Sequence, residues 1–257
     1  MPPLSVTVIT KDESAHIDAC LESVAWADER LVVDCGSQDD TVARARHNGA
    51  RVIEKDWPGY ADQKNYAARE ASHEWILSLD ADERVTPELA EEIRRVLSSD
   101  PGVAGFRIPR VTFHLGRWIR TTDWYPDPQL RLYDRRRARW QTRRVHESVT
   151  TDGAVGRLTQ ELQHFAYRDI AHHLLTMNRY TTLAADDMFE AGRRAGLLDL
   201  IAHPPAAFVR NYVLRRGVMD GMAGFIISAM NAHYVLLKFA KLWARANVPP
   251  DPTSPGR

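Results

Sequence analysis

Three acidic residues directly follow an apolar run in the first third of the chain. The run 75–79 (Trp-Ile-Leu-Ser-Leu) has the length and composition of a buried strand, and Asp80, Asp82 and Glu83 come after it. Carboxylates at the C-terminal end of a parallel strand lie where open α/β sheets bind ligands. Two of them, two positions apart, can hold a divalent cation that also contacts phosphate oxygens. The pattern predicts a Mg²⁺ or Mn²⁺ site; the alternative is that Asp80 and Asp82 only cap the following turn.

Composition and charge limit the classes of protein to which the chain can belong. Its 257 residues are 44% hydrophobic, enough to bury a full core in one large domain, or in one domain with an appendage. Residues 1–100 carry 11 basic and 21 acidic side chains, whereas residues 101–257 carry 23 and 13. The acidic first part argues against nucleic acid as a partner. The basic second part suits phosphates, acidic glycans or an anionic membrane surface, unless the two parts only balance each other.

The cysteines and the first residues of the chain indicate the cellular compartment of the protein. Cys20 and Cys35 are too few for a disulfide framework or a metal cluster, which favours a reducing environment. The chain enters a strand-like run at residues 4–10 without a basic leader and apolar segment, so no signal peptide is visible. We therefore expect a cytoplasmic protein.

Alternating strand-like and helix-like segments must position the acids. Strands are predicted at 4–10, 31–33, 51–53 and 75–79, and helices lie between them, the one before the acids opening at Gln63. Thr86 and Pro87 predict the start of a further helix. This order predicts a largely parallel sheet. Because the first turn lacks the glycine patterns of dinucleotide folds and phosphate loops, a metal must bind the phosphates, and it would also make a diphosphate a better leaving group.

Four motifs in order and spacing resemble the inverting family 2 glycosyltransferases of the GT-A fold. They are Val-Ile-Thr-Lys-Asp-Glu at 8–13, Val-Val-Asp-Cys-Gly-Ser at 32–37, Gln-Lys-Asn at 63–65 and Leu-Asp-Ala-Asp-Glu at 79–83. The resemblance implies an α/β fold with a mixed, mainly parallel sheet that binds a nucleotide-sugar. Two positions depart from the family pattern, because Cys35 stands where serine is usual and Asp40 where glycine is common.

The same resemblance implies roles for individual residues. Asp34 is expected to read the nucleobase, Lys64 to lie near the diphosphate, and Asp80 and Asp82 to bind ribose and metal. Thr10 and Glu13 of the first motif are expected among the contacts to the donor.

The stretch 101–165 is expected to bind the acceptor. The motifs at 124–127 (Trp-Tyr-Pro-Asp), 130–132 (Leu-Arg-Leu), 138–140 (Ala-Arg-Trp) and 145–147 (Val-His-Glu) narrow the resemblance to the lipopolysaccharide-core glucosyltransferase-like branch. Asp123 departs from it, since a glycine is more usual before the tryptophan.

An inverting displacement needs a carboxylate that takes the proton of the acceptor hydroxyl. Asp127 is the first candidate for this base, because it aligns with the position that generally carries it in the family. Glu147 is the second and Asp123 the third, and the alternative for Asp127 is an ordinary acid in a turn. His146 is a candidate metal or phosphate contact, although a lone histidine is often structural.

Basic and apolar residues dominate the rest of the chain. Seven arginines lie within 131–144, and we expect one or two of them to touch the diphosphate or an anionic acceptor. After residue 168 the chain is predicted to be helical, with Asp169 as a helix cap. The run 218–240 is apolar but interrupted by charge, so it is expected to lie on a membrane rather than to span it, or else to pack on the catalytic domain. Its membrane-facing residues would be Phe225, Ile226, Ile227, Leu236 and Leu237.

These predictions combine into one hypothesis. Residues 1–165 form a GT-A domain, with a nucleotide-sugar-binding half at 1–100 and an acceptor half at 101–165, and residues 166–257 form a helical, membrane-associating extension. The enzyme would move a hexose from a UDP donor, with Mg²⁺ or Mn²⁺, to a lipopolysaccharide-core or other lipid-linked acceptor at the inner face of the cytoplasmic membrane. The alternatives are a polyprenyl-phosphate glycosyltransferase, a degenerate sugar-binding module, and a nucleotidyltransferase, whose glycine-rich N-terminal loop is missing.

Overall fold

The computed structural model describes residues 1–99, 102–141 and 148–249, which form two compact units. The first unit consists of Met1–Phe113 and Pro126–Ala166. The second consists of His114–Tyr125 and the described chain from Tyr167 onward.

A mixed sheet forms the centre of the first unit. Its strands follow the order β3-β2-β1-β4-β8-β6-β12-β5, with β11 also paired to β6. The first four run parallel, while β8 is antiparallel to both β4 and β6. The predicted α/β fold with a mixed, mainly parallel sheet is thereby confirmed. The strands are β1 (Leu4–Thr10), β2 (Glu29–Asp34), β3 (Arg51–Glu54), β4 (Trp75–Asp80), β5 (Glu83–Val85), β6 (Gly105–His114), β8 (Asp127–Asp134), β11 (Val155–Arg157) and β12 (Leu162–His164).

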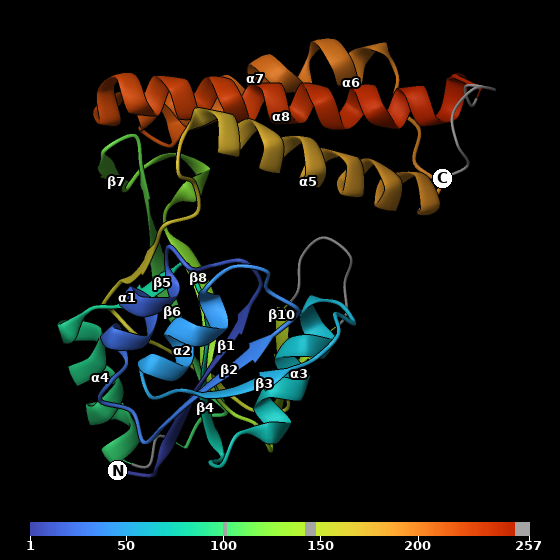
Figure 1. Cartoon of the computed structure of the whole chain (residues 1–257). Helices are drawn as coiled ribbons and strands as arrows, with labels where there is room; N and C mark the ends of the chain where they lie inside the picture. The colour runs from blue at the N-terminus through green and yellow to red at the C-terminus, as the bar shows by residue number, and fades with distance from the viewer. Residues whose placement is uncertain (100–101, 142–147, 250–257) are drawn as a thin grey trace. The chain divides into compact units, whose positions relative to one another are not determined.

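Helices cover both faces of this sheet (Figure 1). Alternate residues of β1 point to opposite faces, so Val6 and Val8 pack with α1 (Ile17–Ser23), α2 (Thr41–His47) and α4 (Pro87–Ser98). Ile9 packs on the other face with α3 (Tyr60–Glu70) and with β9 (Ala138–Gln141) and β10 (Ser148–Thr151), which form a separate antiparallel pair. Two apolar layers therefore hold the carboxyl ends of β1, β2 and β4 in place.

Helix starts were predicted well where a cap residue marks them. The Thr86 hydroxyl accepts a hydrogen bond from the Leu89 N–H at 3.1 Å, so the predicted N-cap is confirmed. In contrast, α3 begins at Tyr60 rather than at Gln63, because Gly59 already accepts the Gln63 N–H at 2.9 Å. The four-residue strand β3 was predicted at 51–53, whereas the short strands β5 and β9 to β12 were not, since so short a stretch carries little periodicity.

Helices dominate the second unit. The predicted cap at Asp169 is confirmed, since its carboxylate accepts the His172 N–H at 2.7 Å. The long helix α8 runs beside α5 and, on its other side, beside α6 and α7 (Figure 1). By length and composition, residues 217–247 are long and apolar enough to cross a membrane. The elements are β7 (Arg117–Ile119), η1 (Thr122–Trp124), α5 (Ile170–Glu190), α6 (Leu197–Ile201), α7 (His203–Val209), η2 (Arg210–Leu214), η3 (Gly217–Asp220) and α8 (Gly221–Asn247).

The division of the chain differs from the expected one in one segment. The change near residue 166 lies close to the expected boundary, but His114–Tyr125 was assigned to the acceptor half and belongs to the helical unit. Hydrogen bonds explain this, because Thr121 donates to the buried Asp220 at 2.5 Å and the Asp123 N–H donates to Asn211 at 2.8 Å.

Glu92 offers a test of how α4 is fixed to the chain that precedes β12. Its buried carboxylate accepts the N–H groups of Thr159 and Gln160 and the Thr159 hydroxyl, at 2.8–3.1 Å. Glu92→Ala removes these charged acceptors and should lower the free energy of unfolding by about 2–3 kcal/mol in urea titrations. Glu91→Ala, an exposed neighbour on the same helix, is the control. Equal unfolding midpoints for the two variants would contradict the role given to Glu92.

Candidate functional site

Polar residues end three neighbouring strands at one edge of the sheet. Thr10 is the last residue of β1 and lies opposite Asp34, the last residue of β2. Asp80 ends β4 and lies opposite Ile9 of β1. Because the carboxyl ends of parallel strands meet at one edge, the structure brings together three of the residues predicted to bind the donor.

Asp34 organises the loop that follows β2. One carboxylate oxygen accepts the N–H groups of Gly36 and Ser37, both at 2.9 Å, and the other accepts the Ser37 hydroxyl at 2.5 Å. Gly36 has a φ of 83°, which a residue with a side chain rarely adopts, and this explains the Asp-Cys-Gly-Ser motif. Asp34 is only 1% exposed, so its carboxylate is fixed before any ligand arrives.

Thr10 and Glu13 lie beside this loop. The Thr10 carbonyl accepts the Cys35 N–H at 3.0 Å, whereas its buried hydroxyl has no hydrogen-bond partner among the described residues. Glu13 is half-buried, and its backbone N–H donates to the Thr41 hydroxyl at 2.8 Å. The Thr10 hydroxyl thus retains a free donor and acceptor at the sheet edge.

Two cations already bind the Asp80 carboxylate. The Lys64 ammonium lies 2.9 Å from one oxygen, and the Arg131 guanidinium lies 2.5 Å from the other. Burial alone would raise the pKa of Asp80, but the two positive charges more than offset burial and hold the pKa well below its ordinary value. The negative charges of Asp80 and Glu83 in turn raise the pKa of Arg131 against the effect of its own burial. Asp80 is therefore an ionised member of a network.

The motif 63–65 contributes to this network in two ways. The Lys64 ammonium also lies 4.4 Å from the centre of the Trp140 ring. The Asn65 side chain donates to the Trp140 carbonyl at 2.9 Å and accepts the Trp140 N–H at 3.0 Å. Asn65 thereby fixes β9 against α3 and places the tryptophan ring against the lysine.

Glu83 connects Asp80 to β6 and β8. It is fully buried, accepts the Asp80 N–H at 3.0 Å, and pairs with Arg131 at 2.7 Å and with Arg110 at 3.0 Å. Arg110 then reaches one oxygen of Asp127 through two nitrogens, at 2.6 and 2.9 Å. The acidic turn is thus capped by Glu83, and not by Asp80 or Asp82, which was the alternative interpretation of the motif.

These side chains form a linear chain of alternating charge, called here the ion-pair chain. Its members, in spatial order, are Lys64, Asp80, Arg131, Glu83, Arg110 and Asp127. Three cations and three anions cancel in charge, while the buried Nε of Arg131 has no hydrogen-bond partner among the described residues.

Asp127 lies at one end of the ion-pair chain, where it starts β8. Gln129 donates to its second oxygen at 2.5 Å, so each oxygen has a partner that fixes the carboxylate. The side chain remains 33% exposed, which leaves one face open to a ligand. Asp123, the third candidate base, lies in the second unit, where Arg210 and Asn211 bind its carboxylate. Glu147 and His146 lie outside the described residues.

Asp82 is the one acid of the motif that is not a member of the ion-pair chain. Its near partner is His164, whose Nε2 lies 3.4 Å away, and its side chain is 25% exposed. The other ring nitrogen of His164 shares a hydrogen bond with the Thr112 hydroxyl at 3.2 Å, which orients the ring. Burial alone would raise the pKa of Asp82, but the charge and hydrogen bond of His164 outweigh it and lower the pKa.

Asp82 and His164 offer an oxygen and a nitrogen ligand to a divalent metal. Among residues 1–99, 102–141 and 148–249, no group of three His, Cys, Asp or Glu side chains could hold a metal ion by itself. Mg²⁺ is commonly bound by one or two carboxylates, with phosphate oxygens and water completing its shell. The donor set therefore fits a metal that binds together with a nucleotide diphosphate.

Several residues of the site were not predicted. From the sequence, Glu83 is only the third acid of its motif and Arg131 is one arginine of seven. No sequence pattern marks Arg110 or His164. Arg131 is a member of the ion-pair chain, whereas Arg135 and Arg136 pair with Glu74 and Asp134. Contact of one or two arginines with the diphosphate or the acceptor stays a prediction. A signal for Arg131 was available, since it is a charged residue in an otherwise apolar strand pattern, Leu-Arg-Leu, and such a charge requires a partner.

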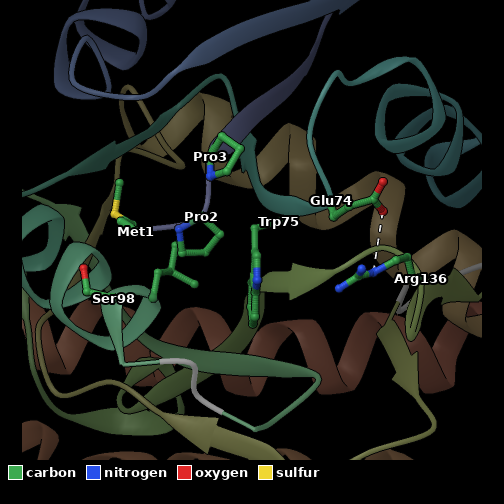
Figure 2. Close-up of a pocket in the computed structure, with 8 residues that line it drawn as sticks. Met1, Pro2, Pro3, Glu74, Trp75, Ser98 and Arg136 are labelled. Carbon is green, nitrogen blue, oxygen red and sulfur yellow. Dashed lines mark ion pairs between the residues drawn. The ribbon is translucent and has the colours of Figure 1, made fainter.

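A separate cavity lies at the other end of the sheet. Its volume is about 400 Å³, and it is lined by residues that include Pro3, just before β1, and Trp75, the first residue of β4. Figure 2 shows these residues, with the ion pair of Glu74 and Arg136 at one side. Ligands of open α/β sheets bind at the carboxyl ends of the strands, so this cavity is not the donor site.

Glu83 offers a test of the ion-pair chain. Glu83→Gln keeps the side-chain shape but leaves the buried Arg131 with one carboxylate fewer, so the free energy of unfolding should fall by about 3 kcal/mol. The measurement is urea unfolding followed by circular dichroism, with the exposed Glu70→Gln as the matched control. If Glu83→Gln unfolded at the same urea concentration as Glu70→Gln, the pairing of Glu83 would not matter to the fold.

Comparison with known proteins agrees with the predicted resemblance. The model of the family described as "Glycosyl transferase family 2" matches residues 5–157. The lipopolysaccharide core biosynthesis glycosyltransferase LpsC of Rhizobium meliloti is 33% identical over 95% of this chain and 93% of its own length. An uncharacterized glycosyltransferase of Rickettsia felis is 30% identical over 94% and 90%.

A solved structure with partial similarity is glucosyl-3-phosphoglycerate synthase from Mycobacterium tuberculosis in complex with Mn²⁺, UDP and phosphoglyceric acid. It is 24% identical, with a TM-score of 0.37, over 45% of this chain and 44% of that protein. The family match covers every member of the ion-pair chain and Asp82 but ends before His164, and the match to LpsC extends over both units. The chain is therefore a family 2 glycosyltransferase, as its motifs predicted.

Proposed function

We propose that the enzyme is a metal-dependent, inverting glycosyltransferase that moves a hexose from a UDP-sugar to a lipopolysaccharide-core or other lipid-linked glycan. The observation that carries the proposal is the exposure and pairing of two carboxylates. Asp82 and Asp127 are both partly exposed, and Arg110 pairs with Asp127 at 2.6 Å. Asp82 serves the donor and Asp127 serves the acceptor. The similarity to LpsC of Rhizobium meliloti supports the acceptor class.

The donor binds at the carboxyl edge of β1, β2 and β4 in this proposal. Asp34 reads the nucleobase from its fixed position, with Thr10 and Glu13 beside it. A carboxylate oxygen can accept more than one hydrogen bond, so Asp80 can receive a ribose hydroxyl while it stays paired with Lys64 and Arg131. Lys64 lies close to the diphosphate and is held there by Asp80.

Asp82 and His164 hold the divalent ion, Mg²⁺ or Mn²⁺, together with the donor. The ion supplies positive charge that stabilises the leaving diphosphate. Thr112 orients His164 so that its Nε2 faces Asp82. His146 remains a further proposed ligand from outside the described residues.

Asp127 acts as the general base. The acceptor hydroxyl oxygen forms the new bond to C1 of the sugar, on the face opposite the nucleotide, while the bond from C1 to the phosphate oxygen breaks. The hydroxyl proton passes to Asp127, and the nucleotide leaves as its diphosphate. Arg110 and Gln129 keep the carboxylate in one orientation, which reduces the reorganisation needed in the transition state. Glu147 is the second candidate for this role.

A lipid-linked acceptor implies work at a membrane. We place the enzyme at the inner face of the cytoplasmic membrane, with its helical unit as the part that meets the lipid. The basic charge of residues 101–257 supports attraction to anionic headgroups.

The base can be tested by a substitution that keeps its shape. Asp127→Asn should reduce the rate of transfer by about 10²–10⁴-fold but leave the affinity for UDP-sugar and Mn²⁺ unchanged, because the base faces the acceptor. Radiolabelled sugar transfer and calorimetric binding of UDP provide the two measurements. Asp152→Asn, with a side chain that is 72% exposed, is the control. Near-parental transfer by Asp127→Asn, combined with inactivity of Glu147→Gln, would move the base to Glu147.

The metal ligand can be tested without the reaction. Asp82→Asn should abolish the increase in UDP affinity that Mn²⁺ gives, because the neutral amide is a far weaker ligand than a carboxylate. Calorimetric titration of UDP with Mn²⁺ and with EDTA measures this difference. The exposed Asp62→Asn should behave as the parent does. An undiminished effect of Mn²⁺ in Asp82→Asn would remove Asp82 from the metal site.

A further inference from the structure

The second unit exposes large apolar side chains beside the start of α8. Five of them lie within ten residues of chain and are called here the apolar tip. They are Val213 (58% exposed), Leu214 (72%), Val218 (54%), Met219 (69%) and Met222 (72%). Large apolar side chains that are exposed close together mark sites of protein–protein or membrane interaction.

The helix α6 adds a second apolar group to the unit. Leu197, Leu198 and Ile201 are 71%, 80% and 61% exposed. Figure 1 shows α6 and α7 on the side of α8 that faces away from α5. In contrast, Ile227 of α8, one of the residues expected to enter the membrane, is 1% exposed and packs on Ile119 and Ala223. Phe225 and Leu236, two other residues expected to enter the membrane, are 45% and 37% exposed.

Arginines flank the apolar tip. Residues 193–222 contain five arginines and two aspartates, and three of these arginines are paired: Arg193 with Asp199, and Arg210 and Arg215 with Asp123. Asp220 is buried and pairs with Arg117 at 3.2 Å, so it does not offset the charge at the surface. Arg216 is exposed and has no carboxylate partner within the described part of the chain.

We propose that the apolar tip and α6 insert into the interfacial layer of an anionic phospholipid bilayer, with the arginines at the headgroups. This inference rests on the proposed function, which needs access to a lipid-linked acceptor, and it names the surface that provides access. Interfacial anchors combine buried apolar area with attraction to anionic lipid. A second copy of the chain fits less well, because a two-fold interface would bring the arginines of one patch against the same arginines of the other.

The apolar tip is also bonded to the segment that leads to the catalytic carboxylate. The Thr122 N–H donates to the Arg215 carbonyl at 2.9 Å, and Arg117 donates to the Asp220 carbonyl at 3.0 Å. Segment 114–125 therefore belongs to the same compact unit as the tip, and Asp127 follows it by two residues in the sequence. A bilayer bound at the tip would hold the segment next to the lipid that carries the acceptor.

Vesicle flotation with the full chain tests the proposal. The parent should float with phosphatidylcholine vesicles that contain phosphatidylglycerol, and much less with phosphatidylcholine alone. Leu214→Ser/Met219→Ser should weaken binding to the anionic vesicles about tenfold or more. Leu174→Ser/Leu175→Ser is the matched control, since these residues are 45% and 70% exposed on α5. Arg215→Gln/Arg216→Gln should bind the anionic vesicles about fivefold more weakly per arginine. Its binding should also depend less on the salt concentration.

Each outcome decides the proposal. Absence of flotation by the parent would overturn it, as would equal losses in the α5 control and the tip variant. If the parent is a dimer without lipid and the tip variant is a monomer that still floats, the surface is an interface between copies. Asp127→Asn should float like the parent. Loss of membrane binding can therefore be distinguished from loss of the proposed catalysis.

Discussion

The pairing of buried Glu83 with Arg131 is the interaction on which the rest of the site depends. Glu83 is fully buried and the Arg131 side chain is 4% exposed, so neither charge is stable without the other. Glu83 starts β5 and Arg131 lies in β8, which means that the pair connects the acidic turn to β8. Each partner then binds a further charged residue, and the ion-pair chain extends to Lys64 at one end and to Asp127 at the other.

Charge balance within the ion-pair chain has a chemical consequence. The charges of its six members cancel. The carboxylate of Asp82 lies outside the ion-pair chain, and its near partner is His164. A site with one uncompensated carboxylate is suited to a divalent ion that brings its remaining ligands from a diphosphate. The same balance keeps Asp80 ionised and occupied, so in the mechanism that we propose Asp82 is the metal ligand and Asp80 is not. Their identical residue type conceals this difference.

The sequence predicted the parts of the site that depend on local order. The apolar run before Asp80 and the cap at Thr86 are local signals, and both correspond to elements of the structure. Arg110 and His164 could not be found in this way, because β6 and β12 reach the site only through strand pairing far along the chain. Asp123 and Asp127 are four residues apart but belong to different units, a division set by the contacts of Asn211 and Asp220.

The central claim is that Asp82, and not Asp80, holds the metal while the ion-pair chain stays intact. Crystals grown with UDP and MnCl₂ can be measured at the manganese absorption edge, where anomalous scattering locates the ion. The account predicts one manganese peak in contact with the Asp82 carboxylate and the diphosphate, with Asp80 still paired to Lys64 and Arg131. A manganese ion bound to Asp80, with those two ion pairs broken, would contradict it.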